Sequence, residues 1–196
     1  SGRPDELMAM EEYARVEKFP IIGPVAGNMC YQLARIIQAK TIFEMGSGYG
    51  YSTAWLAKAV QENGGGTVHH VVWDSELSKM AQTHLDRLGY AEIVQFHIGE
   101  AVEVLGSMSG PFDLVFNDID KDGYPDALPV IETKLKRGGM LIVDNMLLGG
   151  RVFDKHDCAA NTEGVRELTK RINSSPKWLG SIVPIRDGLL LAYRAA

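Results

Sequence analysis

The stretch EMGSGYGYS, residues 44–52, decides how the rest of the chain is interpreted. The apolar segment Thr41–Met45 leads into it and predicts a strand, and a helix is predicted from about Ser52. Between them, three glycines at alternate positions allow a sharp turn and a close approach of the backbone to a ligand. The stretch therefore predicts a strand, a ligand-binding turn and a helix. A tight turn with no ligand is the structural alternative.

The spacing of these glycines separates two classes of cofactor. Dinucleotide-binding turns use GxGxxG, in which the helix N-terminus lies close to a pyrophosphate. Here the spacing is GxGxG, and Tyr51 occupies the third glycine position of the dinucleotide pattern. A ligand without a phosphate does not need that approach, so the spacing favours S-adenosylmethionine over NAD.

Strands and helices are predicted to alternate beyond this stretch. Further strands are expected at 68–73, 93–98, 112–117 and 140–143, with helices at 76–88, 99–106, 123–135 and 162–173. Two helices, at 5–18 and 25–38, precede the first strand. Such alternation is typical of a parallel sheet covered by helices on both faces.

The end of the chain departs from this alternation. Leu179–Ile185 and Leu189–Tyr193 predict two strands joined through Asp187-Gly188, which is typical of an antiparallel hairpin. The expected fold class is therefore α/β, with a mostly parallel seven-stranded sheet, a C-terminal antiparallel hairpin and helices on both faces. This architecture excludes a TIM barrel and disfavours a plain dinucleotide-binding fold. A length of 196 residues suits one domain, 1–196.

Composition and charge exclude several classes of protein. Hydrophobic residues make up 45% and charged residues 23%, which is typical of globular chains, and the net charge of −5 offers no general attraction for nucleic acid or anionic membrane. No apolar run reaches the roughly 18 residues of a membrane helix, and no signal peptide is visible. Cys30 and Cys158 are too few for a disulfide framework, so a cytoplasmic location is expected.

Acidic residues follow the second and third predicted strands. Asp74 ends the second strand, where a carboxylate can accept hydrogen bonds from both ribose hydroxyls. Gly99-Glu100-Ala101 ends the third strand, where the edge of an adenine would lie. Asp74 and Glu100 also stand at the beginning of predicted helices, so a helix N-terminal acid is the alternative for each.

Oxygen-bearing side chains follow the fourth and fifth strands. Asp118 comes directly after the fourth strand, and Asp144 and Asn145 directly after the fifth. Neighbouring parallel strands end at the same edge of a sheet, so these three side chains are expected to meet. Oxygen-only ligands suit Mg²⁺ or Ca²⁺, and also Mn²⁺, but not zinc. The alternative is a set of solvated acidic loops.

Lys121 lies three residues beyond Asp118. A neighbouring cation favours the neutral amine, which can act as a general base. The alternative is a surface ion pair with Asp120 or Asp122, which contributes little to stability.

These motifs together resemble the cation-dependent O-methyltransferases typified by catechol and caffeoyl-coenzyme A O-methyltransferases. The resemblance extends from Gly27 to the final hairpin. It rests on EMGSGYGYS at 44–52, DIDKDGY at 118–124, VDNMLLGG at 143–150 and VPIRDGLLLAYR at 183–194. It implies a Rossmann-like class I methyltransferase fold, with residues 1–38 as a short helical lid, and a homodimer. The apolar residues Leu7, Met8 and Met10 are candidates for the dimer interface.

The resemblance also implies roles for individual residues. The metal ligands would be Asp118, Asp144 and Asn145, and the catalytic base would be Lys121. The cofactor S-adenosylmethionine would contact Ile22, Gly46, Gly48, Ser52, Asp74, Glu100, Ala101 and Asp118. Ile22 would reach the methionine end of the cofactor, and Asp74 the ribose. Tyr124, Trp178 and His156 could line the acceptor site, although packing roles are the stronger interpretation for all three.

Three functions remain open from the sequence. The leading one is metal-dependent methylation of a hydroxyl on a small catechol-like or phenolic acceptor. The second keeps the chemistry but modifies a hydroxylated uridine of transfer RNA, which a basic surface around the acceptor mouth, formed by Arg151, Lys155 and Arg186, would favour. The third is a nucleotide-dependent oxidoreductase or cofactor-binding module, against which Tyr51 argues.

Overall fold

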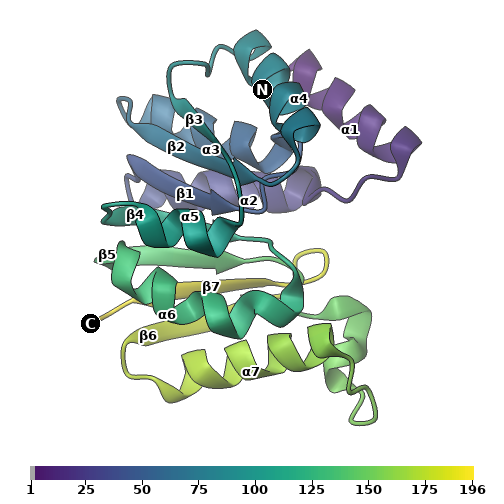
Figure 1. The fold of residues 1–196 in the computed structure, drawn as a ribbon, viewed down its shortest axis with the longest axis vertical. Coiled ribbons are helices and arrows are strands. Elements are labelled where there is room, and N and C mark those ends of the chain that lie inside the picture. The colour runs from purple at the N-terminus through teal and green to yellow at the C-terminus, as the bar shows by residue number, and fades with distance from the viewer. Residues whose placement is uncertain (1–2) are drawn as a thin grey trace.

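The structure, a computed structural model, describes residues 3–196, and within them seven strands form one sheet in the order β3-β2-β1-β4-β5-β7-β6 (Figure 1). The strands are β1 Thr41–Met45, β2 Thr67–Val72, β3 Val94–Ile98, β4 Phe112–Asn117, β5 Leu135–Val143, β6 Trp178–Val183 and β7 Leu189–Arg194. The helices are α1 Asp5–Glu17, α2 Gly23–Ile36, α3 Tyr51–Glu62, α4 Ser75–Arg87, α5 Ala101–Ser107, α6 Tyr124–Lys134 and α7 Ala160–Ser174, with short 3-10 turns η1 Lys121–Gly123 and η2 Leu148–Phe153.

Strand pairing confirms the expected fold class. Strands β1 to β5 pair in parallel, whereas β7 pairs antiparallel with both β5 and β6. The strand order reverses direction between β1 and β4, and in open α/β sheets such a switch point is where ligands bind, beyond the carboxyl ends of the strands.

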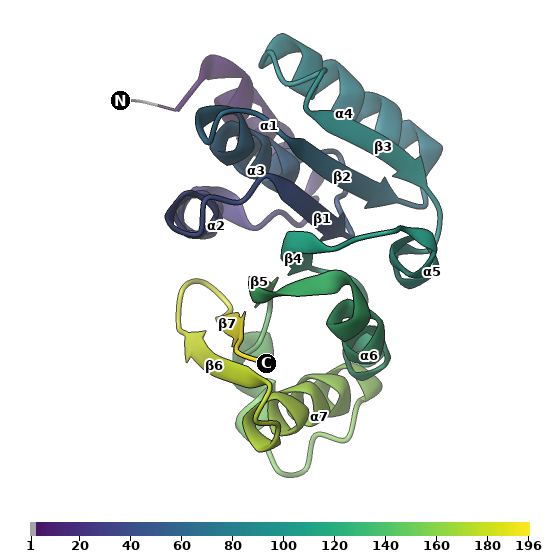
Figure 2. The same cartoon turned by 90° about the vertical axis from the view of Figure 1, so that its left-hand side faces the viewer.

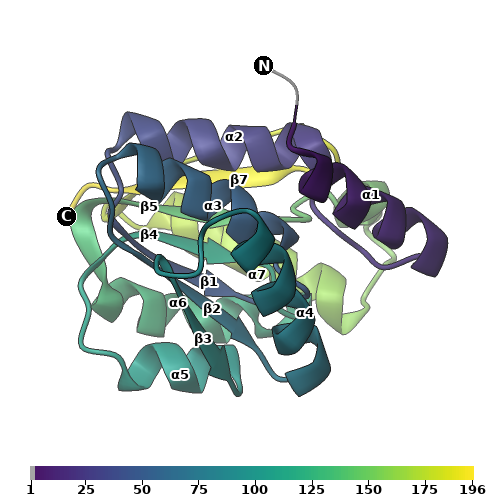
Figure 3. The ribbon, with the colours of Figure 1, turned by 90° about the horizontal axis from the view of Figure 1, so that it is seen from above.

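The sheet separates two hydrophobic cores. Alternate residues of each strand point to opposite faces, so Ile42 joins the core under α1 to α4, and Phe43 joins the core under α5 to α7. Figures 2 and 3 show the two layers of helices, with α2 and α3 on one side of the sheet and α5 and α6 on the other. The layers leave the loops at the carboxyl ends of the strands as the ligand-binding edge.

Strand β5 differs from its expected boundaries. It begins at Leu135, whereas the sequence predicted a helix to residue 135 and a strand only from Met140. Gly138, which has a positive φ of 78°, and its neighbour Gly139 interrupt the apolar pattern by which a strand is recognised in the sequence. The register against β4 shifts between Phe112 and Leu114, where these extra residues are accommodated.

Helix α1 packs against its own chain. Leu7 and Met10 are buried in the core, while Met8 is 45% exposed. The suggestion that Leu7 and Met10 serve a dimer interface is therefore wrong, because the same side chains are buried beneath α1. Within residues 3–196, no helix combines the length and apolar character needed to cross a membrane.

Candidate functional site

A cavity of about 770 Å³ opens at the carboxyl ends of the parallel strands. Its size suits a small-molecule ligand or cofactor. All the residues that the sequence nominated as cofactor contacts, metal ligands or catalytic base line this one cavity: Ile22, Gly46, Gly48, Ser52, Asp74, Glu100, Ala101, Asp118, Lys121, Asp144 and Asn145. The structure thus brings together residues that follow the ends of β1, β2, β3, β4 and β5 and a residue from the segment before α2.

The glycine turn forms the floor of the cavity. Ser47 is held against β2, because its backbone N–H donates to the Val71 carbonyl at 2.9 Å and its Oγ accepts from the Val71 N–H at 3.0 Å. Gly46 adopts a φ of 83°, and a Cβ added there would stand 2.6 Å from the backbone oxygen of Asp118. Only glycine fits where the β1 turn passes so close to the end of β4.

Beneath this turn lies a buried polar group on β1. Glu44 is fully buried and accepts a hydrogen bond from Thr53 Oγ1, which also lies 3.0 Å from His70 Nδ1. Burial raises the pKa of Glu44 to about 7 and lowers that of His70 to about 3. These side chains tie the first turn of α3 to β1 and β2, which fixes the position of the glycine turn.

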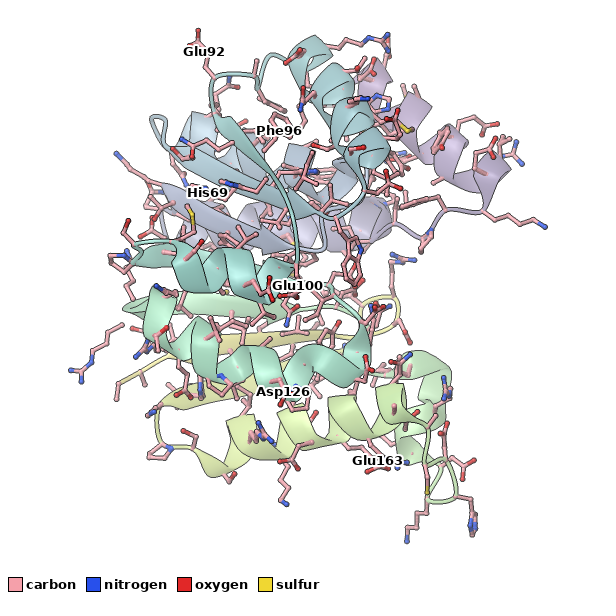
Figure 4. All side chains as sticks on the ribbon, viewed as in Figure 1. His69, Glu92, Phe96, Glu100, Asp126 and Glu163 are labelled. Atoms are coloured by element: carbon pink, nitrogen blue, oxygen red, sulfur yellow. The ribbon has the colours of Figure 1, made fainter. Side chains whose placement is uncertain are left out.

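Asp74 and Glu100 are helix N-caps at the rim of the cavity. Asp74 Oδ1 accepts from the N–H groups of Glu76 and Leu77 at 2.7 and 3.2 Å, and Glu100 Oε2 accepts from Glu103 N–H at 2.7 Å. Figure 4 labels Glu100 where β3 passes into α5. The capping alternative is confirmed for both residues, and each keeps a second carboxylate oxygen at the cavity rim.

The oxygen cluster is positioned by backbone hydrogen bonds between neighbouring strand ends. Asp118 N–H donates to the Met45 carbonyl at 2.9 Å, and Asp144 N–H donates to the Asn117 carbonyl at 3.2 Å. Tyr124, fully buried, donates its hydroxyl proton to the Asp144 carbonyl at 3.0 Å. These bonds hold the two carboxylates at adjacent strand ends, as the sequence predicted.

Both carboxyl groups are harder to ionise than usual. Burial, together with the negative charge of Asp118, raises the pKa of Asp144 to about 6, against the attraction of Arg186 and Lys121. Burial also raises the pKa of Asp118, while Lys121 and Arg186 oppose the shift. Two carboxylates that repel each other in a buried place are stabilised by a cation.

Lys121 forms an ion pair, but with a partner that the sequence did not suggest. Its Nζ donates to Asp118 Oδ1 at 2.8 Å, rather than to Asp120 or Asp122. The same Nζ lies 5.7 Å from the centre of the Tyr124 ring. The amine is therefore held at the cavity edge, beside the proposed metal ligands.

The donor set fits a hard divalent cation. Asp144 Oδ1 is buried and has no hydrogen-bond partner among the described residues. Asn145 uses its Nδ2 to donate to Asp187 Oδ2 at 3.2 Å, which leaves its amide oxygen free to act as a ligand. Residues 3–196 contain no group of three or more His, Cys, Asp or Glu side chains that could by itself hold a metal ion. The candidate set is instead two carboxylates and one amide, with open positions left for an acceptor.

Phe19 and Trp73 are among the cavity residues that the sequence did not nominate, whereas Arg186, which the sequence placed on a basic surface around the acceptor mouth, does line the cavity. Trp73 is 69% exposed and precedes Asp74, so an unburied tryptophan at a strand end was the signal available. Phe19 and Arg186 reach the cavity only through tertiary packing. Trp178 is buried and donates to Glu132 at 3.0 Å, and neither it nor Tyr124 nor His156 lines the cavity.

The chain is similar to several known proteins. A family model described as O-methyltransferase matches residues 8–195. A catechol O-methyltransferase of Niastella koreensis is 30% identical over 87% of this chain and 80% of its own length. One of Mycobacterium tuberculosis is 30% identical over 82% of this chain and 72% of its own. The crystal structure of the O-methyltransferase TomG from Streptomyces achromogenes, in complex with SAM, has a TM-score of 0.89 and 27% identity over 100% of this chain and 92% of that one.

Proposed function

This chain belongs to the O-methyltransferase family, and from that premise we propose that it transfers a methyl group from S-adenosylmethionine to a hydroxyl of a small catechol-like acceptor, with the help of a divalent cation. The observation that carries the proposal is the edge of the cavity where Asp118, Asp144 and Asn145 lie together with Lys121. Family membership also sets aside the oxidoreductase alternative.

The cofactor is proposed to lie across the ends of β1, β2 and β3. Gly46, Gly48 and Ser52, with Ile22, would contact its methionine end. The free oxygen of Asp74 would accept from the ribose hydroxyls, and Glu100 with Ala101 would border the adenine. Trp73 offers an exposed aromatic face beside them. The shared cavity supports this arrangement, and TomG and a Bacillus cereus O-methyltransferase were crystallised with SAM and SAH respectively.

The proposed chemistry is a direct displacement at the sulfonium methyl. A Mg²⁺, Mn²⁺ or Ca²⁺ ion bound by Asp118, Asp144 and Asn145 would favour ionisation of the acceptor hydroxyl. Lys121 would accept the proton of that hydroxyl. The glycine turn and the strand ends hold the reactants in place, and such positioning supplies much of the acceleration in reactions of this type.

Several broader expectations from the sequence stay proposals. They are one domain over 1–196 with residues 1–38 covering the cofactor, assembly as a homodimer, and a reducing cytoplasmic location. Both cysteines are free, Cys30 buried and Cys158 exposed, which supports the last of these. Support for the transfer RNA alternative is reduced, because Arg151 forms an ion pair with Asp157 at 2.7 Å.

The acceptor class is tested by paired substrates under identical conditions with Mg²⁺. Two adjacent hydroxyls can both reach a single cation, whereas two meta hydroxyls cannot. Methyl transfer from labelled S-adenosylmethionine should therefore be far faster to catechol than to resorcinol. Equal rates would contradict chelation of the acceptor. Methylation of unmodified or hydroxyuridine-containing transfer RNA in preference to catechol would support the alternative instead.

A further inference from the structure

Arg186 occupies an unusual position in the turn between β6 and β7. Its φ is 53°, in the left-handed region, which is strained for a non-glycine residue. The turn is fixed from outside, because Asp187 accepts from Gly149 N–H at 2.6 Å and from Asn145 Nδ2 at 3.2 Å. Glycine would adopt this conformation without strain. The presence of an arginine here therefore suggests a functional role for its side chain.

That side chain reaches across the cavity mouth. Its Nη1 donates to the carbonyl of Ile21, and its Cδ, Nε and Cζ would lie 3.6–3.7 Å from a Cβ placed on Gly23. In Figure 2 the β6–β7 loop lies beside α2, which begins at Gly23. The guanidinium is thus held over the cavity by the segment that precedes α2.

Most of the hydrogen-bonding capacity of Arg186 is unused. Within residues 3–196, its Nε and Nη2 have no hydrogen-bond partner, and the guanidinium forms no ion pair. Lys121, the other cation of the cavity, is already paired with Asp118. Arg186 is therefore the unpaired cation of the cavity lining, and its planar fork of N–H groups suits a carboxylate.

Resting on the proposed function, we propose that Arg186 binds a carboxylate carried by the methyl acceptor, so that the acceptor is a hydroxylated aromatic acid rather than a neutral catechol. Asp118, Asp120, Asp126 and Asp144 also line the cavity. An anion is disfavoured beside them and favoured at Arg186. This contrast orients the acceptor, with its carboxylate toward the β6–β7 loop and its hydroxyls toward Asp144 and Asn145.

Calorimetry on the complex with S-adenosylhomocysteine and Mg²⁺ tests this without turnover. The probes are 3,4-dihydroxybenzoate and 3,4-dihydroxybenzamide, which differ mainly in charge. The wild type should bind the acid at least about 10-fold more tightly than the amide, as expected for hydrogen bonds to a charged group. Arg186→Gln should weaken the acid by about 10- to 100-fold and the amide by less than about threefold. Arg186→Gly, which suits the φ of 53°, should do the same without a folding defect.

The matched control is Arg137→Gln, an exposed arginine on β5 outside the cavity lining, which should leave both affinities unchanged. Equal binding of acid and amide by the wild type would overturn the proposal, as would equal losses in the Arg186 variants. A loss of S-adenosylhomocysteine affinity with the acid preference retained would instead assign Arg186 to the cofactor carboxylate. Failure of the general function is distinct, since it would appear as acid binding without methyl transfer.

Discussion

At the scale of single residues, the pair of Lys121 and Asp118 links the two halves of the proposed chemistry. One side chain is a proposed proton acceptor and the other a proposed metal ligand, and they are 2.8 Å apart. The pair is partly buried, and the cation–carboxylate contact stabilises both groups in place. A substitution at either position therefore has to be interpreted through both binding and turnover.

Lys121→Ala should lower turnover by about 10²–10⁴-fold, the range for loss of a general base. Its affinity for S-adenosylmethionine should not change, because the glycine turn lies elsewhere in the cavity. Lys121→Arg should not restore turnover, since a guanidinium cannot accept a proton at ordinary pH. Steady-state kinetics and calorimetry measure the two effects. A fully active Lys121→Arg enzyme would make Lys121 an electrostatic residue and not a base.

Asp74 combines a structural role with a proposed ligand role, and two substitutions separate them. Asp74→Ala removes the N-cap of α4, which should cost about 1 kcal/mol of stability, and should weaken S-adenosylmethionine binding by roughly 1–3 kcal/mol. Asp74→Asn keeps an N-cap and should retain thermal stability. Its cofactor affinity should lie between that of the wild type and that of Asp74→Ala. If Asp74→Ala lowers the melting temperature but leaves cofactor affinity intact, Asp74 is only a cap.

At the scale of elements, the turn between β1 and α3 depends on the close approach of Gly46 to the end of β4. Gly46→Ala should destabilise the fold and abolish cofactor binding, because its Cβ would lie 2.6 Å from Asp118 O. Gly64→Ala is the matched control, since Gly64 has a φ of 93° with nothing within 4 Å, so it costs only the roughly 1–2 kcal/mol of strain. Denaturant unfolding and calorimetry on both variants should separate crowding from strain. Equal behaviour of the two would contradict the close approach.

Elements also show what the sequence could and could not predict. Asp118, Asp144 and Asn145 were predictable because parallel strands bring their carboxyl ends to one edge. The early start of β5 was not, because Gly138 and Gly139 interrupt the apolar pattern. Arg186 was expected on a basic surface around the acceptor mouth, but its contact with the Ile21 carbonyl, 165 residues away, was not predictable. Long-range packing of this kind leaves no local pattern.

At the scale of the whole molecule, buried histidines make stability depend on pH. His69, labelled in Figure 4, is 8% exposed and lies 3.0 Å from His97. Burial and the nearby His97 lower the pKa of His69 from 6.5 to about 4, and burial lowers the pKa of His70 to about 3 and also lowers that of His97. At pH values between the pKa of 6.5 in the unfolded chain and the lowered pKa values in the folded one, the unfolded chain binds more protons. Acid therefore favours unfolding. Glu44 acts in the opposite direction, because its raised pKa of about 7 favours the folded state as the pH falls toward 4.5.

The free energy of unfolding should therefore fall by a few kcal/mol as the pH drops from about 6.5 to 4. His69→Phe keeps a ring stacked on Phe43 and edge-on to Phe112 but cannot titrate, so it should flatten this dependence. His156→Gln, at an exposed loop position, should leave it unchanged. Urea unfolding at several pH values measures the slopes. An unchanged slope in His69→Phe would show that other groups govern the acid sensitivity.

We propose that one cavity holds the cofactor and, at a separate edge, a divalent cation needed for methyl transfer. The most direct test measures catechol methylation and S-adenosylhomocysteine affinity on the same preparation while the metal is removed by chelation and then restored with Mg²⁺. Turnover should be lost and then recovered while cofactor affinity stays nearly constant, and Asp144→Ala should behave like the chelated enzyme. Turnover that continues unchanged without metal would contradict it, because the carboxylates would then be acidic strand ends with no part in the reaction.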